Sequence, residues 1–330
     1  MSSPLPQHIH TFGQDLKRRF GERVHKLAIH AGFTCPNRDG SKGRGGCTFC
    51  NNVSFSPNAR QLPDIARQIA SGRAVLARRT GARRFIAYFQ AYTNTYADVA
   101  TLRAMYDEAL REPDVVGFSV GTRPDCVPDG VLDLLSEYRD LGHEVWLELG
   151  LQSAFDDTLE RVNRGHGFDE YRAAVDAARR RGLKVCTHLI VGLPGETRDH
   201  ALSSLERVVE LGVDGLKLHP LHVVKGTRLA NDWRRGNYAP WTQQDYVETA
   251  ADLVERTPEN VVYHRLTGTA SPQVLLAPDW CARKWRVIDA IAETLVRRGT
   301  RQGSALANPS TPTEDPVSWN WSALPATSRH

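Results

Sequence analysis

Three cysteines stand close together near the start of the chain, in a segment rich in glycine. Cys35 is separated from Cys47 by eleven residues, and Cys47 from Cys50 by two. Thiolates are the usual ligands of iron–sulfur clusters and a common ligand of zinc. Three thiolates leave one corner of a four-iron cluster, or of a zinc tetrahedron, without a cysteine. A small molecule can bind the metal at that corner, so the spacing favours an iron–sulfur cluster with an exchangeable site.

Two other interpretations of these cysteines stay open at this point. The first is a structural zinc ion with a distant fourth ligand, because no histidine lies inside the loop; His30 and Cys186 are the candidates. The second is a redox-active disulfide within the Cys-x-x-Cys pair, beside a free third thiol.

The composition indicates a folded protein of the cytoplasm. The chain has 330 residues, 41% of them hydrophobic, which suffices for one large α/β domain or two ordinary ones. The other three cysteines, Cys126, Cys186 and Cys281, are scattered and do not resemble the disulfide framework of a secreted protein. The N-terminus lacks the apolar core of a signal peptide, and no apolar run approaches the length of a membrane span.

The charge balance is mildly basic, with a formal net charge of +4 and a sequence pI of about 8.8. This excess is compatible with RNA binding but does not demonstrate it. Basic runs such as Arg179-Arg180-Arg181 fall at the ends of expected helices, where cations complement the helix dipole. We therefore expect most of them to be solvated surface residues.

Strand-like and helix-like patterns alternate along the chain. Six short apolar segments bounded by glycine or proline are expected to be strands: 26–30, 84–90, 115–121, 144–151, 184–191 and 215–219. Amphipathic segments lie between them. Such alternation implies a parallel sheet with right-handed crossovers, and six units predict an α/β partial (β/α)6 barrel.

The expected barrel occupies residues 25–230, after an N-terminal extension at 1–24. A C-terminal α-rich extension with one strand candidate at 260–265 follows at 231–302 and is expected to pack on the barrel. Residues 303–330 lack apolar periodicity and are expected to form a disordered tail, although Trp319 and Trp321 could dock it onto a surface.

Polar residues gather where the expected strands end. Ligands bind at the carboxyl ends of parallel strands, and the cysteine loop follows the first strand directly. Other polar residues near strand ends are Gln90, Arg123, Asp125, Glu148, Gln152, His219 and His222. Packing alone does not require this arrangement, so the sequence predicts one site at this end of the barrel.

Eight short motifs follow one another in a fixed order between residues 10 and 290. They are GFTCPNRDG (32–40), GGCTFCN (45–51), YFQAYTNT (88–95), GTRPDC (121–126), ELGLQS (148–153), GLPGET (192–197), KLHPLH (217–222) and HRLTG (264–268). With these motifs the chain resembles the radical S-adenosylmethionine (SAM) enzymes, and within them the YhcC-like group. That group is related to the radical SAM domain of the elongator catalytic subunit.

The resemblance implies a 4Fe-4S cluster on Cys35, Cys47 and Cys50, whose fourth iron would chelate the amino and carboxyl groups of SAM. An electron from an external flavodoxin-type or ferredoxin-type donor would cleave the sulfonium bond. The products would be methionine and a 5′-deoxyadenosyl radical, which would abstract a hydrogen atom from the substrate. The cofactor would carry this chemistry, and the protein would orient it and exclude water.

The resemblance also implies contacts to SAM. Phe49 would lie near the adenine, Gln152 would contact the ribose, and Arg164 would pair with the carboxylate. Gln90 stands where many members hold a turn for the amino group, although Tyr88-Phe89-Gln90 departs from that turn. The backbone of Val191 and Gly192 would flank the adenine.

Four further residues have several interpretations. Glu148 is assigned to the cofactor site, with a substrate contact or an ion pair with Arg123 as alternatives. His219, His222 and His264 are either substrate contacts or buried core residues.

Two functions are compared. The first is a radical SAM enzyme; the second is a zinc-binding or cluster-binding RNA adaptor without radical chemistry. Six strands that end in polar residues favour the enzyme, because a zinc module does not need them. The elongator relationship makes tRNA a candidate substrate, whereas neither DNA nor a membrane is an expected partner.

Overall fold

A seven-stranded parallel sheet forms the centre of the computed structural model, which describes residues 5–51 and 64–306. The strand order is β1-β2-β3-β4-β5-β6-β8, and each neighbouring pair is parallel. The strands are β1 (Val24–Ile29), β2 (Arg84–Phe89), β3 (Val115–Thr122), β4 (Glu144–Gln152), β5 (Lys184–Val191), β6 (Gly215–Pro220) and β8 (Val262–Arg265). A small antiparallel pair joins β7 (Val223–Val224) to β9 (Leu275–Ala277).

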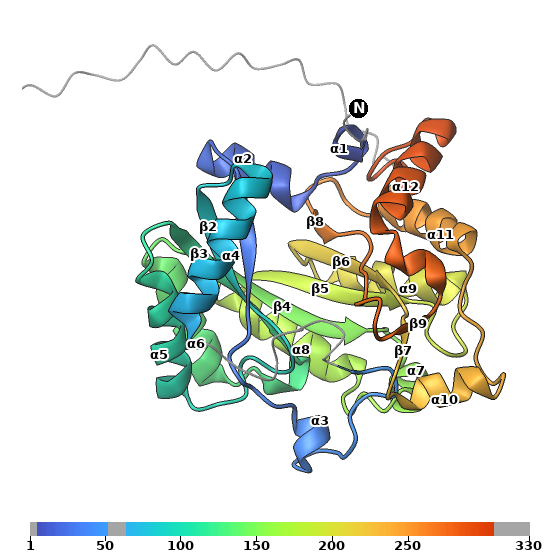
Figure 1. Ribbon diagram of the computed structural model, residues 1–330, viewed down its shortest axis with the longest axis horizontal. Helices are drawn as coiled ribbons and strands as arrows, with labels where there is room; N and C mark the ends of the chain where they lie inside the picture. Colours follow the sequence, from blue (N-terminus) through green and yellow to red (C-terminus); the bar gives the residue numbers. More distant parts are fainter. Residues whose placement is uncertain (1–4, 52–63, 307–330) are drawn as a thin grey trace, which may run out of the picture.

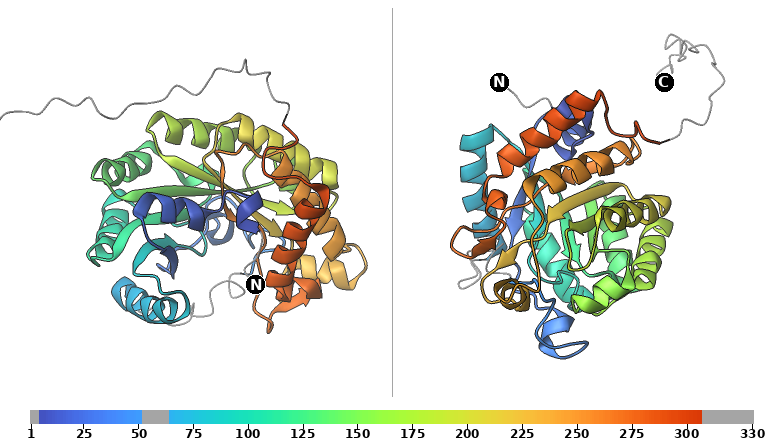
Figure 2. Two further views of the ribbon diagram at one scale, coloured as in Figure 1. Left: turned by 90° about the horizontal axis from the view of Figure 1, so that it is seen from above. Right: turned by 90° about the vertical axis from the view of Figure 1, so that its right-hand side faces the viewer.

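Helices cover the outer side of the curved sheet, as the view from above shows (Figures 1 and 2). The longer ones are α4 (Ile65–Thr80), α5 (Val99–Leu110), α6 (Asp129–Asp140), α8 (Phe168–Arg180), α9 (Arg198–Glu210), α11 (Gln243–Glu255) and α12 (Lys284–Arg298). The shorter ones are α1 (Leu5–His8), α2 (Phe12–Phe20), α3 (Pro36–Asp39), α7 (Asp156–Arg161) and α10 (Arg228–Arg234), with 3₁₀ turns at Pro124–Cys126 and Asp279–Ala282. No helix in the described ranges is both long and apolar enough to cross a membrane.

The six predicted strands are confirmed, with ends that differ by at most two residues. The seventh comes from the strand candidate at 260–265, which pairs with β6. The segment predicted as a C-terminal extension therefore also completes the sheet of the partial barrel. Of the predicted tail, only residues 303–306 are described, and Trp319 and Trp321 lie outside the described residues.

The two faces of β4 explain how the barrel holds a polar interior. Leu147, Leu149 and Leu151 are fully buried in the main hydrophobic core, together with residues of the covering helices. The alternate residues point inward, because successive side chains of a strand lie on opposite faces. Glu148 is one of these inward residues and is 0% exposed.

The N-terminal segment seals the open edge of β8. The amide of Tyr263 donates to the carbonyl of His10 at 2.8 Å, and the amide of Gln302 donates to the carbonyl of His8 at 2.9 Å. The side-chain oxygen of Gln302 in turn accepts from the amide of His10 at 2.9 Å. The first bond pairs part of the β8 edge, which would otherwise be open to other chains, and the two bonds to Gln302 hold the N-terminal segment against it.

Candidate active site

A single pocket at the carboxyl ends of the strands brings most of the predicted site residues together. The predicted residues that line it are Cys35, Cys47, Phe49, Cys50, Gln90, Arg123, Gln152, Arg164, His219 and His222. Four other lining residues were not predicted as site residues: Arg38, Tyr88, His188 and Arg265. The prediction that several strands direct polar side chains to one mouth describes this pocket well.

The three cysteines of the loop are free thiols that share the pocket. Their sulfur atoms do not all lie within 4.8 Å of one another. A single zinc ion with bonds of about 2.3 Å would need sulfur atoms about 3.8 Å apart in a tetrahedron. The three thiols are therefore not arranged around a single zinc position in this structure. Burial raises the pKa of the Cys50 thiol to about 11, and the Cys47 thiol adds to this effect.

The distant zinc ligands considered from the sequence do not join the cysteine loop. Cys186 is fully buried in the middle of β5 and lies outside the lining of the pocket, as does His30. The loop is instead held by hydrogen bonds from its own residues. Arg38 donates to the carbonyl of Cys50 at 2.6 Å, and the side-chain amide of Asn37 donates to Cys47 Sγ at 3.8 Å.

Arg164 connects the cysteine loop to β4. One terminal nitrogen donates to Cys47 Sγ at 3.5 Å, and the other donates to the carbonyl of Gly150. A Cβ at position 150 would lie 2.9 Å from that nitrogen and 2.7 Å from Nε2 of Gln152, so a larger residue there would displace the ends of both side chains. The third nitrogen of Arg164, Nε, is buried and has no hydrogen-bond partner. An unpaired guanidinium donor beside the cysteines fits a ligand carboxylate.

Arg123 has a different partner from the one considered in the sequence analysis. Its guanidinium binds the Asp125 carboxylate through two nitrogens, at 2.8 and 2.9 Å. It also donates to the carbonyl of Arg164 at 2.8 Å. The ion pair of Arg123 with Glu148 is therefore absent, and Arg123 instead supports the backbone that carries Arg164.

The backbone is strained around this part of the pocket. Ala91, Tyr92, Gln152 and Asn163 are the non-glycine residues with positive φ among those described, with φ values of 67°, 63°, 83° and 54°. Ala91, Tyr92 and Gln152 line the pocket, and Asn163 precedes Arg164. Such conformations cost free energy and tend to occur where a ligand site requires a particular geometry.

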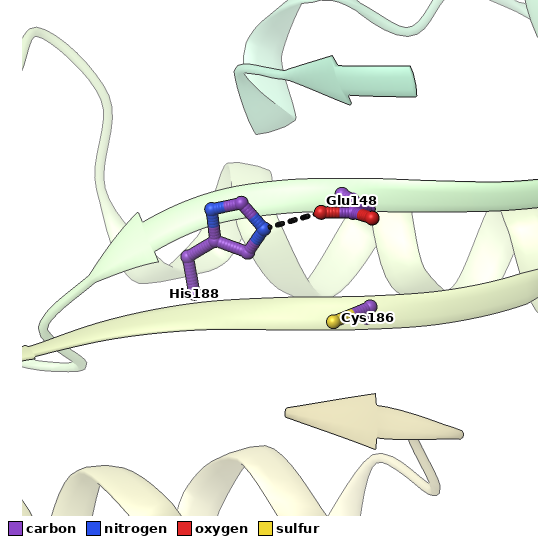
Figure 3. Close-up of side chains that lie close together, drawn as sticks. All are labelled: Glu148, Cys186 and His188. Atoms are coloured by element: carbon purple, nitrogen blue, oxygen red, sulfur yellow. Dashed lines mark hydrogen bonds and ion pairs between the residues drawn. The ribbon is translucent and has the colours of Figure 1, made fainter. Parts of the chain in front are cut away.

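Glu148 lies beneath the pocket, in a cluster of charged groups from five strands. It forms ion pairs with Lys26 of β1 and Lys217 of β6, and its Oε2 accepts from His188 Nε2 at 2.9 Å (Figure 3). His264 of β8 approaches its Oε1 at 3.6 Å. Burial opposes the ionisation of Glu148, but Lys217 and Lys26 outweigh burial and hold the pKa of the carboxyl well below its usual range.

This cluster is a poor place for a metal ion, although three potential ligands meet there. Figure 3 shows Glu148 of β4 beside Cys186 and His188 of β5. One ligand atom from each of the three lies within 4.8 Å of the others. Both carboxylate oxygens of Glu148 are already paired with the ammonium groups of Lys26 and Lys217. A cation would have to enter next to these two positive charges.

The three histidines of the sequence analysis divide into two groups. His219 and His222 line the pocket, with ring centroids 4.4 Å apart. His264 lies deeper, with its ring 3.9 Å from that of Phe12 and 4.4 Å from that of Trp146. Burial lowers the pKa of His222 to about 4 and places those of His219 and His264 well below the usual value. All three are therefore neutral at neutral pH.

Three of the assigned SAM contacts do not line the pocket. Glu148 lies under it, and Val191 is buried in the main core. The carbonyl of Gly192 accepts a hydrogen bond from the Tyr238 hydroxyl at 2.8 Å, and its Cα faces the ring of Trp241. The contact of each with SAM stays a prediction.

The ammonium group of Lys26 gives the cluster a measurable pH dependence. Burial lowers the pKa of Lys26 from 10.5 to about 8, because it outweighs the attraction of Glu148 and is reinforced by Lys217. The unfolded chain thus binds more protons than the folded chain between pH 8 and 10. We expect the contribution of Lys26 to the free energy of unfolding to rise by about 2 kcal/mol over that interval.

Urea unfolding at pH 8 and pH 10 measures this rise. The rise in the free energy of unfolding from pH 8 to pH 10, which we call the gain, should be about 2 kcal/mol smaller in Lys26→Met than in the unsubstituted protein. The same substitution at Lys42, whose side chain is 44% exposed, is the control and should leave the gain unchanged. Equal gains in Lys26→Met and the unsubstituted protein would contradict a lowered pKa.

Comparisons with known proteins agree with this geometry. The Radical SAM superfamily model matches residues 35–208, and the Radical_SAM C-terminal domain model matches residues 213–297. Protein YhcC of Escherichia coli (strain K12) is 54% identical over 308 residues, which are 93% of this chain and 98% of that protein. The tRNA uridine(34) acetyltransferase of Dehalococcoides mccartyi is 32% identical over 154 residues, 46% of this chain but only 33% of that protein.

A solved structure shares the fold at low sequence identity. The archaeal Elp3 of Methanocaldococcus infernus, with an N-terminal deletion, superposes with a TM-score of 0.63 and 19% identity. The alignment covers 84% of this chain and 64% of that one. Because the family match spans residues 35–208 and the likeness to YhcC spans nearly the whole sequence, this chain belongs to the radical SAM superfamily.

Proposed function

We propose that the protein is a radical SAM enzyme that binds one 4Fe-4S cluster through Cys35, Cys47 and Cys50 and cleaves SAM reductively. The observation that carries this proposal is the position of Arg164. Its Nε is buried without a partner, and another of its nitrogens contacts Cys47 Sγ. A cluster with an open iron and an adjacent guanidinium would together hold an amino acid group, of which SAM has one.

The residues of the chain supply binding and orientation. Arg164 pairs with the carboxylate of SAM, Phe49 packs on the adenine and Gln152 contacts the ribose. When bound, the cluster would pass one electron from an external donor of the flavodoxin or ferredoxin type to SAM, so that the sulfonium bond would break into methionine and a group able to take a hydrogen atom from the substrate. The surrounding strands exclude water from the radical.

The alternative of a zinc-binding or cluster-binding RNA adaptor is less well supported. The loop offers three thiolates and no histidine, and neither His30 nor Cys186 joins it as a fourth zinc ligand. An RNA adaptor would also not need this pocket, which is lined by residues with strained backbone and by Arg164, whose buried Nε has no partner.

For the substrate, we propose tRNA as the first candidate to test. One relative is named a tRNA uridine(34) acetyltransferase, and the segment after β7 adds a chemical reason. This segment contacts the cysteine loop: Asn51 donates to the carbonyl of Lys225 at 2.6 Å, and the amide of Leu229 donates to the carbonyl of Thr48 at 2.9 Å.

Exposed cations gather on these neighbouring segments. They are Arg44, Lys225, Arg228, Arg234 and Arg235, which we call the basic rim. Figure 1 shows α3 and α10 at the same end of the molecule. A phosphate backbone that crossed the rim would release counterions and would bring a nucleotide to the pocket.

The cluster ligands provide the direct test of the proposed enzyme. Replacing Cys35, Cys47 or Cys50 with Ser should abolish cluster binding and SAM cleavage, because a hydroxyl is a poor ligand for iron held by sulfur. Iron content, visible absorbance and 5′-deoxyadenosine formation after anaerobic reconstitution measure this. Cys281→Ala is the control, since Cys281 is buried away from the pocket. A protein that binds one zinc ion and no iron would support the adaptor instead.

Arg164→Ala should keep the cluster but weaken SAM binding. The loss of a charged hydrogen bond predicts about 1.5–3 kcal/mol, or roughly a 10-fold to 150-fold increase in Kd. Equilibrium dialysis with labelled SAM measures it. Arg161→Ala is the matched control, because Arg161 lies three residues earlier and is exposed. Unchanged affinity in Arg164→Ala would leave Arg164 with a purely structural role.

Binding of tRNA should depend on the basic rim. In filter binding, the double substitution Arg234→Gln and Arg235→Gln should weaken retention of bulk tRNA. It should also reduce the slope of log K against log salt by about 2, one unit for each lost phosphate contact. Arg78→Gln with Arg79→Gln is the control, because this exposed pair ends α4 at the opposite end of the sheet. Retention that is absent at low salt, or indifferent to salt, would remove tRNA as the substrate.

A further inference from the structure

One arginine of the pocket, unlike Arg38, Arg123 and Arg164, makes no hydrogen bond or ion pair with a described residue. Arg265 ends β8, lines the pocket and is exposed. Among the described residues it has no ion-pair partner within 4 Å and no hydrogen-bond partner. Other charged residues of the pocket do have partners, such as Arg123 with Asp125. An unpaired guanidinium at a pocket wall is a candidate contact for a ligand anion.

Neighbouring residues hold Arg265 in place. It lies beside Lys217 in the pairing of β6 with β8, and the Tyr246 hydroxyl donates to the carbonyl of Leu266. After Arg265 the chain passes over the ring of His219. A Cβ at Gly268 would lie 2.4 Å from Nε2 of that ring, so glycine is required there. The backbone that carries the guanidinium is therefore fixed, and this lowers the free-energy cost of ordering the side chain when a ligand binds.

Positive charge exceeds negative charge in this part of the barrel. Lys26 and Lys217 flank a single carboxylate, that of Glu148, and Arg265 lies beside Lys217 in the pairing of β6 with β8. Burial raises the pKa of the nearby Cys186 thiol and lowers that of His188 to about 4, so both are neutral near pH 7. Positive charge of this kind is costly in a protein interior unless an anion compensates it. The described residues provide no second anion here, and a ligand can.

His222 adds a second unsatisfied group beside Arg265. It lines the pocket and is only 4% exposed, and its ring nitrogens have the backbone of Gly268 nearby, but without a well-formed hydrogen bond. A neutral imidazole carries one N–H donor, which an oxyanion can accept from. Buried polar groups of this kind normally have a partner in the functional state of a protein.

These groups are distinct from those that face the cysteines. The charges that act on Cys50 are those of Arg38 and Arg164, whereas Arg265 acts on His219 and His222. The pocket therefore has two centres of positive charge. One suits the carboxylate of SAM, and the other is left for a second molecule.

We propose that Arg265 and His222 form an oxyanion subsite, which binds a carboxylate or phosphate group of the substrate. The inference rests on the proposed function, because only an enzyme that acts on a second molecule beside SAM needs such a subsite. The substrate class is accordingly an anionic molecule, or a nucleotide that presents a phosphate to the pocket.

Binding of two simple anions tests the subsite. The probes are inorganic phosphate and acetate, titrated by calorimetry at constant ionic strength into the cluster-loaded protein with saturating SAM. We expect Arg265→Gln to raise the Kd of at least one anion tenfold or more. Arg265→Lys keeps the charge but not the fork, so we expect a smaller increase of about threefold. Arg235→Gln, an exposed arginine of the basic rim, should change it less than twofold.

Two outcomes would overturn the subsite. In the first, Arg265→Gln binds both anions as the unsubstituted protein does, or the unsubstituted protein binds neither. In the second, Arg265→Gln weakens SAM binding as much as anion binding, which would assign Arg265 to the SAM site. If Arg265→Gln does not fold, Arg265→Lys with an unchanged anion Kd is equally decisive against the subsite.

The test separates this inference from the proposed function. Cys35→Ser protein should lose the cluster yet bind the favoured anion within about threefold of normal, measured without SAM in both proteins. If the protein binds no cluster, the proposed enzyme function is contradicted, but the anion titration without SAM can still be made. The tRNA filter assay then identifies the source of the anion: Arg265→Gln lowers retention if the subsite holds a phosphodiester, and leaves it unchanged if the anion belongs to a small molecule.

Discussion

The pairing of Glu148 with two lysines is the interaction on which the interior of the barrel depends. A carboxylate that is 0% exposed would be prohibitively costly alone, and so would two ammonium groups beside each other. Together they allow β1, β4 and β6 to direct charged side chains inward. The interior beneath the pocket is therefore filled by an ion cluster rather than by aliphatic side chains, and its geometry fixes how these three strands face one another.

That constraint shapes the pocket above it. Because both carboxylate oxygens of Glu148 are paired with Lys26 and Lys217, it acts on the site indirectly, as part of the ion cluster beneath the pocket. The rim of the same pocket contains a second set of ionic contacts, in which Asp125 holds Arg123 and Arg123 supports the backbone of Arg164. Two separate sets of ionic contacts thus hold different parts of one pocket.

The sequence predicted the strands well, because short apolar segments bounded by glycine and proline are local patterns. The thiolate spacing is a local pattern too, and the metal site that it indicates stays a prediction. The partners of Glu148 could not be predicted in this way, since Lys26 and Lys217 lie far from it along the chain. The two-residue period of a strand was an available signal, because Lys217 and His219 lie on one face of β6, as Glu148 and Gly150 lie on one face of β4. His188 and Arg265 were missed because this period was not followed along β5 and β8.

The seal between the chain ends has a consequence for folding. His8 and His10 bond to Gln302, and His10 also to Tyr263, so the first described helix and the last sheet strand meet only after almost the whole chain is available. Closing so long a loop costs entropy before its contacts form, and this raises the contact order of the protein. The barrel can begin to assemble from its neighbouring strands, but its β8 edge must be completed late. We therefore expect the pocket wall that β8 supplies to form after the walls from β1 to β6.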